Sequence, residues 1–170
     1  MKKLLMTGLT IGALLGTVAC SNTADNNDNN KTAQTQTQKE ATKTEINQEK
    51  TINNMAMKIT SDNIVKDDTL KKDQSLLAVH FNIKNNGKVD YGVGAGDFYI
   101  KDSKGNKYTM YGHEDNFGDV IKPGKTLQGI GYYAIPKDAT NLTVVYDKAV
   151  DTSKNDKTLE WNIGTPKTAK

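Results

Sequence analysis

Residues 76–87, LLAVHFNIKNNG, decide the fold class of this chain. Apolar side chains in this stretch recur at every second position, at Leu77, Val79, Phe81 and Ile83. A period of two is that of a strand with one face in a core. The Asn-Asn-Gly that ends the stretch tolerates the positive φ of a tight turn between strands. We therefore predict a half-buried strand that leads into a hairpin connection.

The same pattern continues on both sides of this stretch. Short alternating runs are separated by turn signals, among them residues 102–106 (DSKGN), the pair Pro123-Gly124, and Pro136. Strands spaced this closely, with no convincing helix between them, form two packed antiparallel sheets. The sequence therefore predicts an all-β domain over residues 51–165, an antiparallel β-sandwich of seven or eight strands. A small closed barrel is the alternative.

The inward-facing positions of these strands define a predicted hydrophobic core. Each such side chain contributes about 1.5–3 kcal/mol when it is fully buried. The chain has one cysteine, so no intrachain disulfide can form and packing alone must hold the domain together. The expected inward set is Met57, Ile59, Leu77, Val79, Phe81, Ile83, Phe98, Ile100, Leu127, Tyr133, Ile135, Leu142, Val144, Tyr146 and Trp161.

Several segments, taken in order, carry a resemblance to a known family. Residues 76–87 are followed by FYIKDSKG at 98–105 with Tyr108, IKPG at 121–124, Gly129, YAIP at 133–136, and Trp161. This order and spacing resembles the domain of unknown function found in many Gram-positive lipoproteins, a family described as telokin-like. The resemblance covers roughly residues 52–163. It implies an immunoglobulin-like sandwich in an extracellular setting, and it supplies no ligand and no catalytic residues.

The beginning of the chain has the build of a secretory signal peptide. Lys2 and Lys3 form a positive region, residues 4–16 are apolar, and residues 17–19 (TVA) lead to Cys20. This leader resembles those of bacterial lipoproteins, in which signal peptidase II cleaves before a cysteine that carries diacylglycerol. We expect residues 1–19 to be removed and Cys20 to be the lipid attachment site on the extracellular face of the cell membrane. Because TVA also suits ordinary secretory cleavage, free secretion is the alternative.

A second compositional block follows the cysteine. Residues 20–50 include runs such as NNDNN and TQTQTQ, and residues 21–45 have nothing bulkier than alanine among their apolar side chains. Such a segment cannot bury enough surface to offset the entropy lost on ordering. We predict that residues 20–50 are a disordered tether, that residues 51–165 fold as the sandwich, and that residues 166–170 are a tail.

Composition argues against several classes of function. The 23 basic side chains are all lysine and the formal net charge is +3, which falls to +1 once Lys2 and Lys3 leave with the leader. Lysine lacks the bidentate fork of arginine, so nucleic-acid binding is not expected. The sequence has no Gly-x-Ser-x-Gly elbow, no P-loop and no zinc-binding histidine pair. We expect a protein that is not an enzyme and uses no cofactor.

The segment from Tyr111 to Val120 is the predicted binding loop. It combines aromatic, imidazole and carboxylate groups between two strands, where binding residues are commonly displayed. Contact residues are expected at Tyr111, His113, Asp115 and Phe117. The alternative for Phe117 is that it folds back as a plug over one end of the sandwich.

The same region is also a weak candidate for metal binding. The thioether of Met110 and the imidazole of His113 are ligands that suit copper, and Asp115 and Asp119 add carboxylates. The strand phase set by Tyr108 instead makes Met110 a core residue, and this use is favoured. The other histidine, His80, lies on the polar phase of its strand and is expected to be a solvated surface side chain.

These features together indicate a binding protein. We expect a lipid-anchored extracellular module that presents loops to an extracellular protein or a cell-wall component, with the membrane as its other partner through the lipid. The alternatives are an extracellular proteinase inhibitor with a protruding rigid loop, and a metal-binding lipoprotein that uses Met110 and His113.

Overall fold

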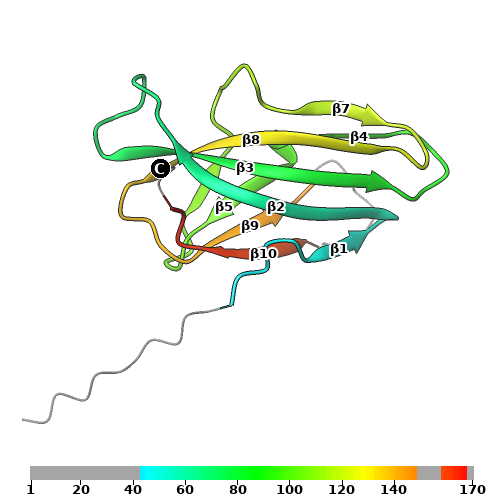
Figure 1. The fold of residues 1–170 in the computed structure, drawn as a ribbon, viewed down its shortest axis with the longest axis horizontal. Coiled ribbons are helices and arrows are strands. Elements are labelled where there is room, and N and C mark those ends of the chain that lie inside the picture. Colours follow the sequence, from blue (N-terminus) through cyan, green and yellow to red (C-terminus); the bar gives the residue numbers. More distant parts are fainter. Residues whose placement is uncertain (1–42, 149–157, 168–170) are drawn as a thin grey trace, which may run out of the picture. The chain divides into compact units, whose positions relative to one another are not determined.

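The computed structural model describes residues 43–148 and 158–167 of the chain (Figure 1). These residues form ten strands and one short 3-10 turn, η1 (Ala95–Asp97). The strands are β1 (Glu49–Ile52), β2 (Met55–Val65), β3 (Gln74–Asn85), β4 (Tyr91–Gly94), β5 (Phe98–Lys101), β6 (Lys107–Thr109), β7 (Gly118–Ile121), β8 (Thr126–Pro136), β9 (Leu142–Tyr146) and β10 (Leu159–Gly164).

Two four-stranded antiparallel sheets pack face to face, in the orders β1-β2-β3-β8 and β10-β9-β5-β6. Figure 1 shows β2, β3 and β8 lying over β5, β9 and β10. The half-buried strand predicted within residues 76–87 is part of β3, a long inner strand that pairs with β2 on one side and β8 on the other. The predicted all-β antiparallel sandwich is confirmed.

The core lies between the two sheets and matches the expected inward set closely. Every residue of that set belongs to the buried cluster except Leu127, which is partly buried against it. Trp161 is fully buried, and its indole N–H donates to the carbonyl of Gln48 at 2.9 Å. The buried cluster also contains residues outside that set, namely Met55, Val93, Ile121 and Ile163.

The strand count exceeds the expectation because the short strands carry little apolar alternation. β4 and β7 form a separate two-stranded ribbon in which Gly92 pairs with Val120 and Gly94 with Gly118. Glycine adds no side chain to an alternating pattern, so the sequence indicates only a crossover here. The turn η1 then leads directly into β5.

The N-terminal boundary of the folded part lies earlier than residue 51. Strand β1 begins at Glu49 and pairs with β2, and the N–H of Glu45 donates to the carbonyl of Asn162 at 2.7 Å. Residues 45–50 therefore lie against the sandwich and not in the tether, although their polar composition resembles that of the tether. The rest of the predicted tether up to residue 42, Cys20 and the leader fall outside the described residues.

The C-terminal boundary shifts in the same way. The N–H of Ile64 in β2 donates to the carbonyl of Lys167 at 3.2 Å, so the first residues of the predicted tail pair with the edge of β2. Within the two described ranges there is no helix long and apolar enough to cross a membrane.

Candidate binding face

The sheet that contains β3 and β8 carries a second cluster of apolar side chains on the face that points away from the core. The inward phase of β3 uses Leu77 and Val79, which leaves Leu76 and Ala78 on the outer face. Ala78 is paired with Tyr132 of β8, and all three outer residues are buried. We call this cluster the apolar patch; it comprises Leu76, Ala78 and Tyr132 with the partly buried Val65, Leu70, Tyr111 and Ile130.

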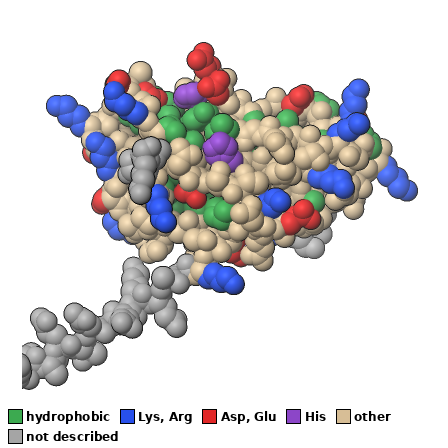
Figure 2. Space-filling model, viewed as in Figure 1, with side chains coloured by type: hydrophobic (Ala, Val, Ile, Leu, Met, Phe, Trp, Pro, Cys, Tyr) green, Lys and Arg blue, Asp and Glu red, His purple; other side chains and the backbone are tan. Residues whose placement is uncertain are grey.

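The predicted binding loop folds onto this patch. The N–H of Tyr111 donates to the carbonyl of Tyr132 at 2.7 Å, and the Tyr111 hydroxyl lies 3.0 Å from Thr69 Oγ1. The ring of His113 stacks on that of Tyr132, with centroids 3.9 Å apart and planes inclined by 22°. Burial raises the pKa of Tyr132 above its usual value. Figure 2 shows hydrophobic side chains gathered around the histidines on this face.

Asn116 holds the loop in place. Its Nδ2 donates to the carbonyls of Tyr111 at 2.6 Å and His113 at 3.0 Å, while its Oδ1 accepts from the N–H of Tyr132 at 2.9 Å. These bonds join the loop to β8 as a strand partner would. Asn116 was not among the residues predicted from the sequence, where its only signal is that asparagine side chains commonly bond to nearby backbone in loops.

His113 and Asp115 face each other, as the sequence suggested for two members of one loop. The N–H of Asp115 donates to His113 Nδ1 at 3.2 Å, and an Asp115 carboxylate oxygen lies 3.8 Å from the same nitrogen. These contacts fold Asp115 back onto the imidazole of His113.

Phe117 does not join the other three residues of the predicted loop site. It points inward, with its ring centroid 5.0 Å from that of Phe81 and 6.1 Å from that of Phe98. The space comes from Gly129, where an added Cβ would lie 2.3 Å from the Phe117 Cβ. Phe117 thus folds back against the core beside Gly129 of β8, as the inward alternative for this residue expects.

Of the predicted metal ligands, the structure shows His113 and Asp115 in contact. Met110 is 41% exposed, so its predicted core position is wrong. The reason is that the chain leaves the β5–β6 sheet at this residue and forms a bridge to Tyr133 of β8, which breaks the strand phase set by Tyr108. Asp119 Oδ1 accepts from the N–H of Val120 at 2.7 Å. Across the described ranges, no three His, Cys, Asp or Glu side chains gather as a metal site would require.

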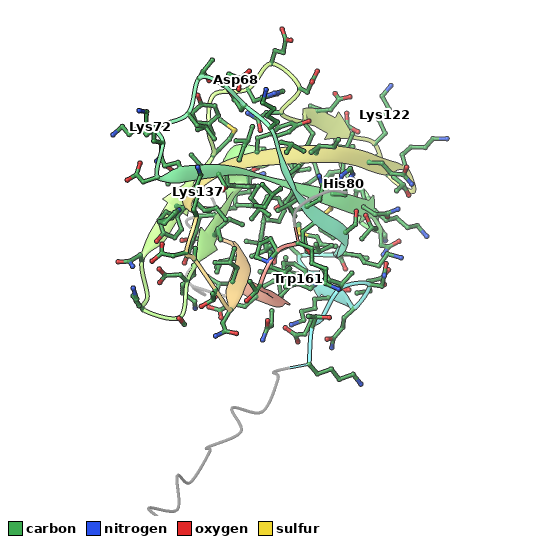
Figure 3. All side chains as sticks on the ribbon, turned by 60° about the vertical axis from the view of Figure 1, so that its left-hand side comes forward. Asp68, Lys72, His80, Lys122, Lys137 and Trp161 are labelled. Atoms are coloured by element: carbon green, nitrogen blue, oxygen red, sulfur yellow. The ribbon has the colours of Figure 1, made fainter. Side chains whose placement is uncertain are left out.

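A shallow hollow of about 310 Å³ adjoins the apolar patch, and Ile130 belongs to both. We call it the polar hollow. His80 lies on its lining and is half-buried, which differs from the freely solvated side chain that the sequence suggests. Figure 3 shows His80 on β3, in the sheet opposite the one that holds Trp161. The other lining residues are Thr60, Phe81, Asn82, Gln128, Gly129 and Ile130.

The protein is an antiparallel β-sandwich domain in which a loop covers part of the outer face of the sheet that contains β3 and β8. Residues 44–157, more than half of the chain, match the family described as "Domain of unknown function (DUF4352)". The chain therefore belongs to this family. No protein of curated function matches the chain by sequence.

Solved structures show the same fold. The ycdA protein of Bacillus subtilis, which is described as a candidate lipoprotein, is 22% identical with a TM-score of 0.58 over 69% of this chain. The chain spans only 38% of the length of ycdA. The yjhA protein of Bacillus subtilis is 17% identical with a TM-score of 0.51, over 68% of this chain and 95% of yjhA. These likenesses concern the architecture of the domain.

Proposed function

We propose that this protein is a lipid-anchored extracellular binding module that captures a cell-surface partner with the apolar patch and the loop above it. The observation that carries the proposal is the apolar cluster on the outer face of β3 and β8. In a sandwich with one solvated face per sheet, the outward residues are polar. The loop covers the buried members of the cluster, and the partly buried Val65, Leu70, Tyr111 and Ile130 leave apolar surface around it. Exposed apolar surface of this kind marks contact sites.

The side chains on this face suit the binding of a protein or cell-wall partner and not the catalysis of a reaction. Tyr111 and His113 offer ring surfaces, with His113 held by stacking on the buried Tyr132 and Tyr111 by its contact with Thr69. Rigid aromatic side chains supply contact area at little cost in conformational entropy. The Thr69 hydroxyl beside Tyr111 donates to Asp67 Oδ1 at 2.6 Å in an exposed turn, where the Thr69 N–H donates to the same oxygen at 2.8 Å. We therefore propose binding without catalysis.

The proposed anchor rests on the sequence, since Cys20 lies outside the described residues. The leader and its single cysteine support acylation, and the description of ycdA as a candidate lipoprotein agrees with the same setting. A tether between Cys20 and residue 43 would let the sandwich reach away from the bilayer. About 20 flexible residues span roughly 25 Å on average.

The test uses the mature chain with Cys20→Ala, labelled and added to intact cells of the species that makes it. Cell-bound label is measured against concentration. We expect saturable binding that Tyr111→Ala weakens. The matched control is Tyr99→Ala on the opposite sheet, where the ring packs under Lys107 Nζ at 3.7 Å. Binding that is unsaturable, or that the two substitutions reduce equally, would contradict the proposed face.

A further inference from the structure

Residues of three adjacent strands, β2, β3 and β8, line the polar hollow. In the β3–β8 ladder His80 is paired with Ile130 and Asn82 with Gln128. Side chains of directly paired residues on one face lie about 4.5–5.5 Å apart at their Cβ atoms. The two amides therefore stand side by side, next to an imidazole and an aliphatic group.

A β-bulge forms the third side. The register of β2 against β3 shifts between Ile59 and Ser61, which leaves Thr60 as the extra residue. The Thr60 hydroxyl donates to the carbonyl of His80 at 3.3 Å. Bulges are frequent next to functional sites because they re-aim side chains and locally open a sheet face. This one places a hydroxyl group at the edge of the hollow.

The polar side chains of the hollow have unused hydrogen-bonding capacity. In the described part of the chain, the side chains of His80, Asn82 and Gln128 form no hydrogen bond with protein groups. Each amide offers one acceptor oxygen and two N–H donors. β3 is paired on both sides, with β2 and β8, and the carbonyl of Ile130 in β8 accepts from the N–H of Phe117, which leaves the side chains to recognise a ligand here.

The chemistry of the lining selects the class of ligand. No lysine, aspartate or glutamate is among the residues that line the hollow, so it offers neither a cation for phosphate nor a carboxylate for an amine. Amide, imidazole and hydroxyl groups beside the aliphatic Ile130 suit a molecule that carries neutral donors and acceptors on an apolar frame. Sugars with hydroxyl and acetamido groups have this character.

We infer that the polar hollow binds one residue of a neutral glycan chain that carries N-acetyl groups. Asn82 and Gln128 hydrogen-bond its hydroxyl or acetamido groups, and Ile130 contacts its apolar face. The volume of about 310 Å³ is at the low end of the range for small-molecule sites, about 300–1,000 Å³, which suits a single sugar unit. The inference rests on the proposed function, because it names a ligand for the same binding face.

The test is an NMR titration of the isotope-labelled mature chain carrying Cys20→Ala. Chitotetraose is the probe, with maltotetraose as a neutral sugar without acetamido groups and inorganic phosphate as an anion. We expect the side-chain NH₂ signals of Asn82 and Gln128 to shift saturably with chitotetraose. Asn82→Ala combined with Gln128→Ala raises Kd about tenfold or more, as the loss of paired polar groups in a site predicts. Tyr99→Ala leaves Kd unchanged.

Each outcome is decisive once signal dispersion shows that a variant is folded. An absent shift, equal shifts with chitotetraose and maltotetraose, or a shift with phosphate alone overturns the inference. If Tyr111→Ala still weakens cell binding in that case, the proposed function stands and only the glycan site fails. If chitotetraose binds at Asn82 and Gln128 while Tyr111→Ala leaves cell binding intact, the apolar patch fails instead.

Discussion

Single residues explain how the loop is fixed to the sandwich. Phe117 packs over Gly129 of β8 and against Phe81, while Gly131 leaves room for the rings of Tyr133 and Phe81. At Gly131 an added Cβ would lie 2.8 Å from the Tyr133 hydroxyl, which itself donates to the carbonyl of Ala95 at 3.1 Å. Burial raises the pKa of Tyr133 well above its usual range. These glycines thus serve packing, not flexibility.

The first prediction concerns Phe117. Phe117→Ala removes a ring that contacts two core phenylalanines and leaves a cavity, so it should lower the free energy of unfolding by about 2–4 kcal/mol. Urea unfolding monitored by circular dichroism measures this change. Tyr111→Ala, which lies in the same loop but on the outer face, should cost clearly less. If the Phe117 variant is as stable as the parent chain but binds cells more weakly, Phe117 is a binding residue and not a core residue.

The second prediction concerns Asp62, whose register partner Val79 points into the core. It lies on the stretch of β2 beyond the pairing with β1, and burial raises the pKa of its carboxyl group. Because the folded-state pKa exceeds the unfolded one, the ionised form costs stability at neutral pH. This cost is relieved as the pH falls through the raised pKa.

Asp62→Asn should therefore raise the melting temperature at pH 7 and flatten its dependence on pH between neutral and mildly acidic solution. The control is Asp68→Asn, since Asp68 is exposed and pairs only with the exposed Lys66 at 3.2 Å. If both variants show the same pH profile as the parent chain, Asp62 carries no penalty in the folded state.

At the scale of elements, the sequence predicts the long strands well and the short ones poorly. In β3 the alternation is clear from Val79 to Ile83. In β8 the inward phase is marked by Leu127, Tyr133 and Ile135, with glycines at the two inward positions between them. β4 and β7 consist largely of glycine and exposed residues, and their pairing depends on tertiary contacts. The apolar cluster on the outer face of β3 could not be predicted, for a different reason. In the run Leu-Leu-Ala-Val both phases are apolar, so the period does not say that Leu76 and Ala78 form a second cluster.

Only part of the candidate site could be predicted from the sequence. The loop of Tyr111, His113 and Asp115 stood out by composition, and the structure brings these residues to one surface. The polar hollow had no such signal, because Asn82 and Gln128 are far apart in sequence and meet only through the β3–β8 register. Thr60 is also unremarkable in the sequence, since a bulge depends on the pairing of two strands.

The third prediction concerns the element that the sequence assigned to the tether. A chain that begins at residue 51 lacks half of β1, the Gln48 carbonyl bonded by Trp161, and Glu45, which forms a 2.8 Å ion pair with Lys50. Each lost hydrogen bond costs about 0.5–1.5 kcal/mol. We expect this chain to melt several degrees below one that begins at residue 43, in a calorimetric comparison. Equal melting temperatures would mean that residues 43–50 add nothing to the fold.

At the scale of the whole molecule, the last prediction concerns location. A protein that captures a partner on the cell surface must be retained at that surface. A single lipid chain gives marginal membrane binding, whereas two or more acyl chains hold a protein firmly. A diacylglycerol on Cys20 would supply two. We therefore expect Cys20→Ala to release the protein into the medium, measured by immunoblots of membrane and culture fractions. Ser21→Ala is the matched control and should stay with the membrane. If the Cys20 variant remains in the membrane fraction to the same extent as the control, something other than this cysteine holds the protein, and the proposed anchor is wrong. The proposed binding face is tested separately, by the binding of the Tyr111 variant to cells.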